Sequence, residues 1–442
     1  MRQLIPLLSF FPFFNFAQVS FSEHIIDTSA GTFATSKISP GDFNSDGFTD
    51  IATLRKTADE LAFYMSNGTS FGARQVIPSS LDYPIDVCSG DFNSDGKEDL
   101  ATIELQGKAV QVFFNQSGGF APGQKIDSNV FFGPAAIFST DFTNDNIPDI
   151  LAVDDTVVYL YENDGSANFT RYKVAGQTEF YSAGVADING DSLPDILLGS
   201  IKLYTYLNNG DGTFTRDTRN EPLINDFIFE IELADIDFDG DNDMAIYYSN
   251  TNSNIDWYSN DGTGKFTLAG SITSTANDVH SMCFGDFNRD NYPDFVTGYG
   301  QTGDLVWIPN NNGTFGNEIV LKTYNLFTRE VAVADVDQDG DLDIFCGQHM
   351  DGLFLWVNQS AQFSLAENKT GSRFYPNPSS GAIHIKVQTD SQLKVLSVNG
   401  QTLQSILLKA GENAIHLNLA KGSYILKWQE ENYTYSEKLI IQ

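Results

Sequence analysis

A nine-residue acidic motif recurs seven times along this chain and constrains its fold more than any other feature. The first copy, DFNSDGFTD, begins at Asp42, and the later copies begin at Asp91, Asp141, Asp187, Asp235, Asp286 and Asp335. Successive copies start 49, 50, 46, 48, 51 and 49 residues apart, and every copy ends in aspartate. Such regular spacing is typical of a repeat architecture in which each copy belongs to one supersecondary unit.

The residues around each motif predict four short β-strands per repeat. A run of small and apolar residues precedes the motif, and an apolar strand such as LATIEL follows it. A third strand ends in a turn of the form Asn-x-Gly-x-x-Phe, and a weaker fourth strand leads to the next repeat. Four antiparallel strands per repeat are typical of a propeller blade. We therefore predict an all-β protein with a seven-bladed β-propeller over residues 18–367.

A ring of blades needs a strand that closes it. Residues 20–27 resemble the fourth strand of later repeats, whereas the seventh repeat has only the short QFSLAEN after its third strand. We predict that residues 20–27 complete the seventh blade and remove its exposed edge. The alternative is that Phe363 to Asn368 take that place.

The side chains at alternating positions of the motif suit a hard cation such as Ca²⁺, which takes six to eight oxygen ligands. Four copies have glycine at the sixth position and two have Asn146 or Asn291, residues that tolerate a left-handed backbone, whereas Ser192 fits less well. Without a cation, neighbouring carboxylates in a chain of net charge −33 repel one another. The alternative is a set of acidic turns that need no metal.

The loop Asp-x-Asx-x-Asp-Gly-x-x-Asp between two strands resembles the FG-GAP, or VCBS, repeat of integrin α-subunit-like β-propellers, over about residues 20–367. The resemblance implies up to seven structural Ca²⁺ ions, held by side chains at the first, third, fifth and ninth positions and by the backbone carbonyl of the seventh. The implied ligands are Asp42, Asn44, Asp46, Phe48 and Asp50; Asp91, Asn93, Asp95, Lys97 and Asp99; Asp141, Thr143, Asp145, Ile147 and Asp149; Asp187, Asn189, Asp191, Leu193 and Asp195; Asp235, Asp237, Asp239, Asp241 and Asp243; Asp286, Asn288, Asp290, Tyr292 and Asp294; and Asp335, Asp337, Asp339, Asp341 and Asp343.

The seven loops are not expected to bind equally. Thr143 is a poorer ligand than Asn or Asp, so the loop from Asp141 is the weakest predicted site. The loops from Asp235 and Asp335 have four carboxylates in the metal shell and a further acidic residue at the seventh position, and they should bind most tightly. Near-identical sites in every repeat favour a structural over a catalytic metal.

The N-terminal residues predict a secretory signal peptide over residues 1–17. Arg2 precedes an apolar run from Leu4 to Phe16, and Ala17 offers a cleavage point. This run is too short to span a bilayer comfortably, and no later segment is long enough. We expect an exported protein without a transmembrane segment.

A second, smaller domain is predicted at residues 374–442, after a linker at residues 368–373. Alternating apolar residues and an Asn-Gly turn predict a small Ig-like β-sandwich. Its residues Tyr375-Pro376-Asn377-Pro378, Gly381, VLSVNGQ, Gly422-Ser423-Tyr424 and Lys438-Leu439-Ile440 closely resemble the type A C-terminal sorting domain of the type IX secretion system of Bacteroidota. The resemblance implies that the type IX machinery exports the protein from a Gram-negative bacterium of that kind. The protein would then be secreted or attached to the outer surface.

No catalytic motif is recognisable, and no catalytic residue is predicted. The patterns G-x-S-x-G and H-E-x-x-H are missing, and His24, His280 and His349 are isolated in the sequence. We therefore expect a protein that is not an enzyme. The strongly negative charge argues against nucleic acid as a partner.

A ligand is expected on the ring face opposite the acidic loops. A bulky residue stands just ahead of each predicted first strand, and these side chains either form an aromatic ring suited to sugar or peptide binding or wedge between blades. They are Phe33, Tyr83, Phe132, Phe180, Phe227, His280 and Phe327. Further candidates in nearby loops are Arg55, Lys56, Tyr181, Asp304, Arg329 and His349.

These features favour a secreted or surface-displayed calcium-binding propeller that binds a macromolecule, either a glycan or a surface protein. Two alternatives remain open at this stage. One is a lyase-like enzyme that acts on extracellular polysaccharide, and the other is a structural surface protein.

Overall fold

The computed structural model describes residues 19–28, 35, 37–116, 119–128, 133–176, 179–221, 223–248, 254–273, 278–325, 327–349 and 352–359 of the N-terminal part, and residues 374–375, 382–387, 389–397, 402–417, 419, 421–430 and 433–441 of the C-terminal part. The chain divides into two compact units, Met1–Ser360 and Ala361–Gln442. The predicted signal peptide, the predicted linker and the alternative closing segment lie outside the described residues. Among the described residues, no helix is long and apolar enough to cross a membrane.

The described residues of the first unit form seven four-stranded antiparallel sheets, as the repeats predict. The first strands are β2 (Lys37–Gly41), β6 (Pro84–Gly90), β12 (Pro134–Thr140), β16 (Ser182–Ala186), β20 (Ile228–Ala234), β24 (Val279–Gly285) and β30 (Thr328–Ala334). The second strands are β3 (Asp50–Arg55), β7 (Asp99–Glu104), β13 (Asp149–Asp154), β17 (Asp195–Gly199), β21 (Asp243–Tyr248), β25 (Asp294–Tyr299) and β31 (Asp343–Gln348). The third strands are β4 (Glu60–Tyr64), β8 (Ala109–Phe113), β14 (Val157–Asn163), β18 (Leu203–Asn208), β22 (Ile255–Asn260), β26 (Asp304–Ile308) and β32 (Gly352–Asn358). The fourth strands are β5 (Gln75–Val76), β11 (Gln124–Ser128), β15 (Phe169–Gly176), β19 (Phe214–Asp217), β23 (Phe266–Thr273), β29 (Ile319–Thr323) and β1 (Phe21–Asp27).

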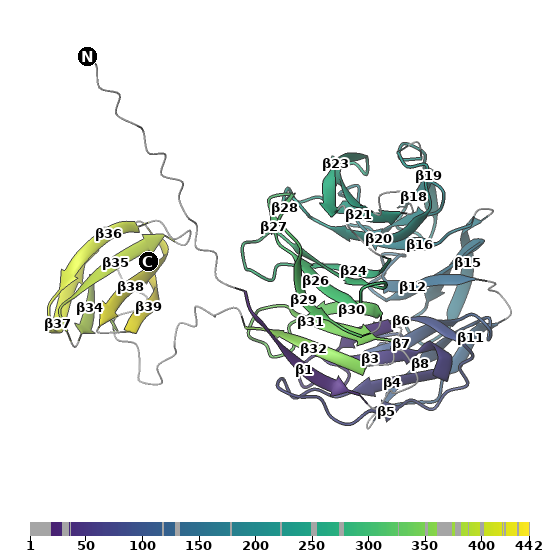
Figure 1. The fold of residues 1–442 in the computed structure, drawn as a ribbon, viewed down its shortest axis with the longest axis horizontal. Helices are drawn as coiled ribbons and strands as arrows, with labels where there is room; N and C mark the ends of the chain where they lie inside the picture. The colour runs from purple at the N-terminus through teal and green to yellow at the C-terminus, as the bar shows by residue number, and fades with distance from the viewer. Residues whose placement is uncertain are drawn as a thin grey trace, which may run out of the picture. The chain divides into compact units, whose positions relative to one another are not determined.

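The sheets form a closed ring. Each first strand contacts the first strand of the next sheet, and β30 returns to β2. Figure 1 shows β1 beside β32 in the last sheet of this ring. The last sheet has the order β1-β32-β31-β30, so its outer strand comes from the beginning of the chain. Strand β1 runs antiparallel to β32, with Phe21 opposite Asn358 and His24 opposite Leu355. The predicted closure by residues 20–27 is confirmed.

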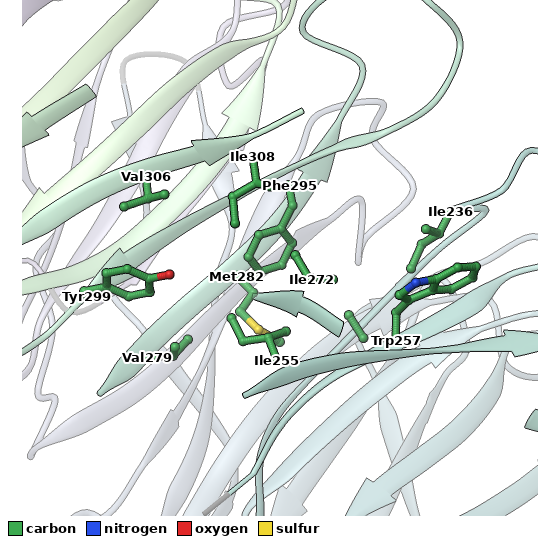
Figure 2. Packing of buried hydrophobic residues seen from close by; sticks show 11 residues of the cluster. Ile236, Ile255, Trp257, Ile272, Val279, Met282, Phe295, Tyr299, Val306 and Ile308 are labelled. Carbon is green, nitrogen blue, oxygen red and sulfur yellow. The ribbon is translucent and has the colours of Figure 1, made fainter. Parts of the chain in front are cut away.

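Burial follows the position of a strand within its sheet. Strands β3, β7, β13, β25 and β31 are buried at every residue, whereas β11 and β29 are mostly exposed. Inner strands are covered on both faces by the adjacent sheets, which explains their continuous apolar sequences. Figure 2 shows one such interface, where Ile255 of β22 lies beside Met282 of the next sheet, and Trp257 of β22 lies near Ile236 in the same cluster.

The described residues of the second unit form two small antiparallel sheets around one core. One sheet has the order β33-β34-β37, and the other has the order β36-β35-β38-β39. Their bounds are Phe374–Tyr375, Ala382–Val387, Ser391–Ser397, Thr402–Leu408, Gly411–His416, Gly422–Glu430 and Tyr433–Ile441 for β33 to β39. Apolar side chains from both sheets, including Ile385, Val395, Leu426 and Trp428, share the core. The alternating apolar residues noted in the sequence therefore face inward.

Candidate functional site

Each acidic motif lies between the first and second strands of its sheet, and the first loop shows its local geometry. The Asp42 carboxylate accepts hydrogen bonds from the backbone N–H groups of Asp46 (3.1 Å) and Gly47 (2.8 Å). Asp46 in turn accepts one from the N–H of Phe48, at 2.9 Å. Carboxylate side chains thus close the loop on itself and still keep lone pairs for a cation, because each oxygen offers two.

Two residues of every acidic loop have a left-handed backbone. The sixth position has a positive φ in all seven loops, and Ser192 adopts φ 70° despite being a poor fit by residue type. The fourth position is left-handed as well, which the sequence did not indicate. Its occupants include Phe238, at φ 62° with its side chain 60% exposed. A bulky residue is strained in this region, so the fold imposes the loop geometry on Phe238.

The ninth aspartate of the motif is buried, as is the apolar residue at the second position. In the second repeat, Asp99 accepts hydrogen bonds from the N–H groups of Phe92 (3.0 Å) and Asn115 (2.7 Å). Equivalent bonds from the end of the third strand reach the ninth aspartate in all seven repeats. Burial raises the pKa of Asp99 to about 7. The ninth aspartate therefore connects its loop to the third strand of the same sheet.

The asparagine that ends the third strand connects neighbouring sheets. In the fourth sheet, Asn208 Nδ2 donates to the carbonyl of Phe142 in the preceding sheet (3.0 Å) and to that of Pro194 in its own loop (3.2 Å). The bridging asparagines are Asn115, Asn163, Asn208, Asn260, Asn310 and Asn358. These asparagines recur in the sequence after six of the seven motifs, but the sequence indicates only a turn there and not a bridge between sheets.

The junction between the last and first sheets lacks a bridging asparagine. Ser66 occupies the equivalent place in the first sheet, where its N–H donates to Asp50 at 2.6 Å. This junction uses other contacts: the Thr49 hydroxyl donates to the carbonyl of Asp335 (3.1 Å), and Gln338 donates to the carbonyl of Gly47. The ring is therefore joined differently where the chain closes it.

Two loops gather carboxylates in the way that a cation requires. Asp235, Asp237 and Asp239 have carboxylate oxygens within 4.8 Å of one another, as do Asp335, Asp337 and Asp343. Asp237 and Asp335 each have a buried Oδ1 without a hydrogen-bond donor. These donor sets fit Ca²⁺, since unsatisfied carboxylate oxygens are its preferred ligands. They belong to the two loops predicted to bind most tightly.

The other loops have an amide or hydroxyl in the third position. The Thr143 hydroxyl already donates to Asp149, at 3.2 Å, which agrees with its weak ligand character. In the sixth sheet, Trp307 Nε1 donates to Asp294 Oδ2, at 3.1 Å. The seven loops thus share a backbone but differ in the donors that remain for a cation.

The opposite face of the ring carries a second candidate site, which begins at a β-bulge. Five of the first strands have a register shift near their start, and the bulged residue stands six positions before the first aspartate of the motif. A bulge redirects a side chain away from the sheet. We call residues at this position rim residues; those described are Ile85, Ala135, Tyr181, Phe229, His280 and Arg329.

The rim residues of the fourth to seventh sheets differ from the others. Ile85 and Ala135 are small or aliphatic, whereas the next four, Tyr181, Phe229, His280 and Arg329, are aromatic or cationic. We call these four the rim arc. The difference occurs at equivalent positions of successive repeats, so the repeat itself does not require it. One side of this face is therefore a candidate ligand surface.

Aromatic rings gather at the fourth- and fifth-sheet end of the rim arc. Phe227 and Phe229 are 44% and 41% exposed, and their centroids lie 6.4 Å apart with nearly parallel planes. Tyr181 meets the Phe227 ring edge-on at 5.6 Å, and Tyr247 lies 6.4 Å from Phe229. Exposed rings clustered in this way present an apolar surface to a ligand.

A mixed aromatic and cationic group lies at the sixth- and seventh-sheet end. The Phe327 ring, 38% exposed, lies 6.5 Å from the His280 ring and 5.8 Å from the His349 ring. The guanidinium carbon of Arg329 is 5.4 Å from the Phe327 centroid. Tyr247 joins the two ends, because it hydrogen-bonds the backbone near Asp278.

The residues predicted to bind a ligand lie in different environments in the structure. Phe33 and Phe132 lie outside the described residues. Phe180 is only 3% exposed and packs between sheets, so the alternative interpretation as a wedge is correct for it. Tyr83 is half-buried beside Lys56.

Two predicted loop candidates are engaged within the fold. Arg55 is buried and paired with Asp27 of β1 at 3.0 Å, which joins the closing strand to the first sheet and removes Arg55 from the ligand face. Asp304 accepts a hydrogen bond from the Thr323 hydroxyl at 2.5 Å. Phe229 and Tyr247 were missed, although the register of the motif gave the position of Phe229.

Comparisons with known families agree with this description. Residues 42–102, 91–152, 141–198, 237–297 and 286–346 match the FG-GAP-like repeat, and together they cover more than half of the chain. The chain belongs to the FG-GAP-like repeat family. Residues 373–442 of this FG-GAP-like repeat protein match the secretion system C-terminal sorting domain, which indicates secretion. The predicted family and sorting tail are confirmed.

The fold of this FG-GAP-like repeat protein also occurs in a fungal lectin. A solved structure of an Agrocybe aegerita lectin, described for its specific recognition of non-reducing terminal N-acetylglucosamine, matches with a TM-score of 0.50 and 19% identity. The match covers 65% of this chain and 81% of the lectin chain. At this identity the likeness shows the β-propeller fold alone. No curated protein matches the chain.

Proposed function

We propose that this protein is an exported, non-enzymatic β-propeller, stabilised by calcium, that binds an extracellular glycan through its rim arc. We take the seven four-stranded sheets as the blades of one seven-bladed propeller, and the C-terminal unit as an Ig-like sorting domain. This domain directs the protein through the type IX machinery of a Bacteroidota-type bacterium. The product is secreted or attached at the cell surface.

The aromatic end of the rim arc carries this proposal. Phe227, Phe229 and Tyr181 leave apolar ring surface in water at one place, although the repeat tolerates small residues there. Exposed apolar clusters mark binding sites more often than they contribute to stability. Sugar rings present apolar C–H faces that stack on aromatic side chains, which suits this surface. The shared fold with a lectin supports the same class of ligand.

Calcium has a structural role in this proposal. The acidic loops lie between first and second strands, whereas the rim arc lies at the other end of the first strands. A cation in a loop therefore holds neighbouring carboxylates together without touching the ligand. Because the unfolded chain has no preformed site, bound calcium stabilises the folded ring by linkage.

Glycan binding is tested with an array of oligosaccharides and the Phe229→Ala variant. We expect the wild-type protein to bind at least one oligosaccharide and Phe229→Ala to weaken that binding about tenfold or more. Phe238→Ala is the matched control, because it removes an exposed phenylalanine from an acidic loop and should leave binding unchanged.

Two results would contradict the proposal. If no oligosaccharide binds, the protein is better explained as a structural surface protein. If incubation with polysaccharides releases shorter products, the protein is an enzyme and the non-enzymatic part is wrong.

A further inference from the structure

The rim arc changes its chemistry along its length. Tyr181 and Phe229 make its first end aromatic, whereas His280 and Arg329 occupy the equivalent rim positions at the second end. His280 and Arg329 are both bulged residues, since the register shifts between Val279 and Ser281 and between Thr328 and Glu330. The bulge in the seventh sheet therefore presents the cationic Arg329 at the position where the bulge in the fifth sheet presents the aromatic Phe229.

Arg329 is the central cation of this second end. Within the part of the chain that the structure describes, its guanidinium has no carboxylate within ion-pair distance. Its Nε is buried and has no hydrogen-bond partner. The nearby Asp278 carboxylate lies 3.4 Å from His280 and does not pair with Arg329. In a chain with 58 acidic residues, an unsatisfied arginine beside the proposed ligand surface points to an oxyanion from outside.

Lys56 supplies a second cation in the turn between β3 and β4, in the sheet next to that of Arg329. Its Nζ is 5.0 Å from the centroid of the Tyr83 ring. Burial lowers the pKa of Lys56, and the positive charge of Arg329 lowers it further. An anion that binds near both cations stabilises the charged form of each.

We propose that the second end of the rim arc binds the carboxylate or sulfate ester of an acidic polysaccharide, with Arg329 and Lys56 as its cationic contacts. This inference rests on the proposed glycan-binding function and specifies its ligand class. A guanidinium presents paired N–H donors that match the two oxygens of such a group. The net charge of −33 disfavours non-specific attraction of a polyanion, so binding requires cations placed at a particular site.

The test uses oligosaccharides that differ only in charge. Hexagalacturonate and its methyl ester are titrated against the full chain by calorimetry, and a sulfated galactan oligosaccharide and its unsulfated form make the second pair. We expect the charged member of at least one pair to bind about tenfold or more tightly than its neutral partner. The pair that shows this preference identifies the anion as carboxylate or sulfate.

Charge-removing variants locate the site. Arg329→Gln and Lys56→Gln should each reduce the preference for the charged sugar to about threefold or less, and Arg329→Lys should retain part of it. Lys265→Gln, which removes one exposed positive charge from a turn at the acidic-loop end, should have no effect. Unchanged thermal melting shows that each variant is folded. If either Arg329→Gln or Lys56→Gln fails to fold, the other variant still tests the site.

The results separate this inference from the proposed function. If neutral and charged sugars bind equally and Phe229→Ala abolishes both, the glycan-binding function stands and the anion site is wrong. If charged sugars are preferred but Arg329→Gln and Lys56→Gln leave the preference intact, the assignment to these residues is wrong. If no sugar binds, both proposals fail.

Discussion

The ninth aspartate of each motif and the bridging asparagine of the same sheet together make the smallest connecting unit of the ring, because that asparagine also reaches the preceding sheet. Asn208 shows the arrangement most completely. Its side-chain donors reach the carbonyls of Phe142 and Pro194, and its Oδ1 accepts from the N–H of Gly210 at 2.9 Å. Asn208 is itself buried, and its bond to Phe142 is fully buried, where an unmade hydrogen bond is costly. The bridging asparagines therefore contribute more to stability than exposed turn asparagines.

Substitution of Asn208 by alanine tests this role. The change leaves two carbonyls and one N–H without partners, so we expect the free energy of unfolding to fall by about 2–3 kcal/mol. Urea unfolding measures the change. Asn209→Ala, next to it but exposed, should cost no more than about 0.5 kcal/mol. Equal costs for the two variants would show that the bridging bonds are not important.

At the scale of elements, the sequence predicted the regular parts well. Seven spaced motifs predicted seven sheets, and the likeness of residues 20–27 to a fourth strand predicted that β1 pairs with β32. Prediction failed where pairing itself decides the outcome. The spacing from the motif gives the position of Phe229, but the bulge that redirects its side chain depends on the pairing of two strands and cannot be seen in the sequence. The burial of Phe180 likewise depends on the packing of neighbouring sheets.

The junction between the last and first sheets gives an element-scale prediction. Ser66 is too short to reach the preceding sheet, whereas asparagine makes this bridge in the other six sheets. We expect Ser66→Asn to raise the free energy of unfolding by about 1 kcal/mol, the usual net value of an added hydrogen bond. Chemical denaturation measures it. A loss of stability would mean that Thr49 and Gln338 already complete this junction.

The closing strand gives a second prediction at this scale. A variant that lacks residues 19–28 leaves the edge of β32 unpaired, and an open sheet edge invites pairing with another chain. We expect a lower melting temperature and concentration-dependent association in analytical ultracentrifugation. Removal of residues 361–442, a separate compact unit, is the control and should leave the ring monomeric. A monomeric, equally stable protein without β1 would contradict this role.

Charged side chains of several sheets lie close together along the first strands of the ring. Glu230 and Glu232 of β20 and Glu330 of β30 lie near Lys37 of β2, whose Nζ is 3.4 Å from Glu330. Burial, together with the charge of Glu230, raises the pKa of Glu232 to about 8. Burial also raises the pKa of Glu330 to about 8, although the nearby positive charge of Lys37 lowers it. The ring therefore holds carboxyl groups that resist ionisation.

This arrangement predicts a pH dependence of stability. Between about pH 4.5 and pH 8 the unfolded chain has released the Glu232 proton that the folded ring still holds, so stability falls as the pH rises through this window. Glu232→Gln removes that loss. At pH 8.5 we expect the variant to be more stable than the wild type by about 1–2 kcal/mol, with little difference at pH 4.5. A difference that is the same at both pH values would contradict the assignment.

We expect the proposed calcium ions to stabilise the whole ring through its acidic loops. At a free calcium concentration of about 100 times the dissociation constant of a site, calcium binding to that site adds about 2.7 kcal/mol to the free energy of unfolding. We expect the melting temperature to be higher in calcium than in chelator by at least about 5 °C. Asp239→Ala should remove one calcium ion from the stoichiometry measured by calorimetry, whereas Asp211→Asn, an exposed aspartate in a turn outside the motif, should not. A shift of no more than about 1–2 °C would mean that hydrogen bonds alone, such as those of Asp42 and Asp99, hold the loops closed.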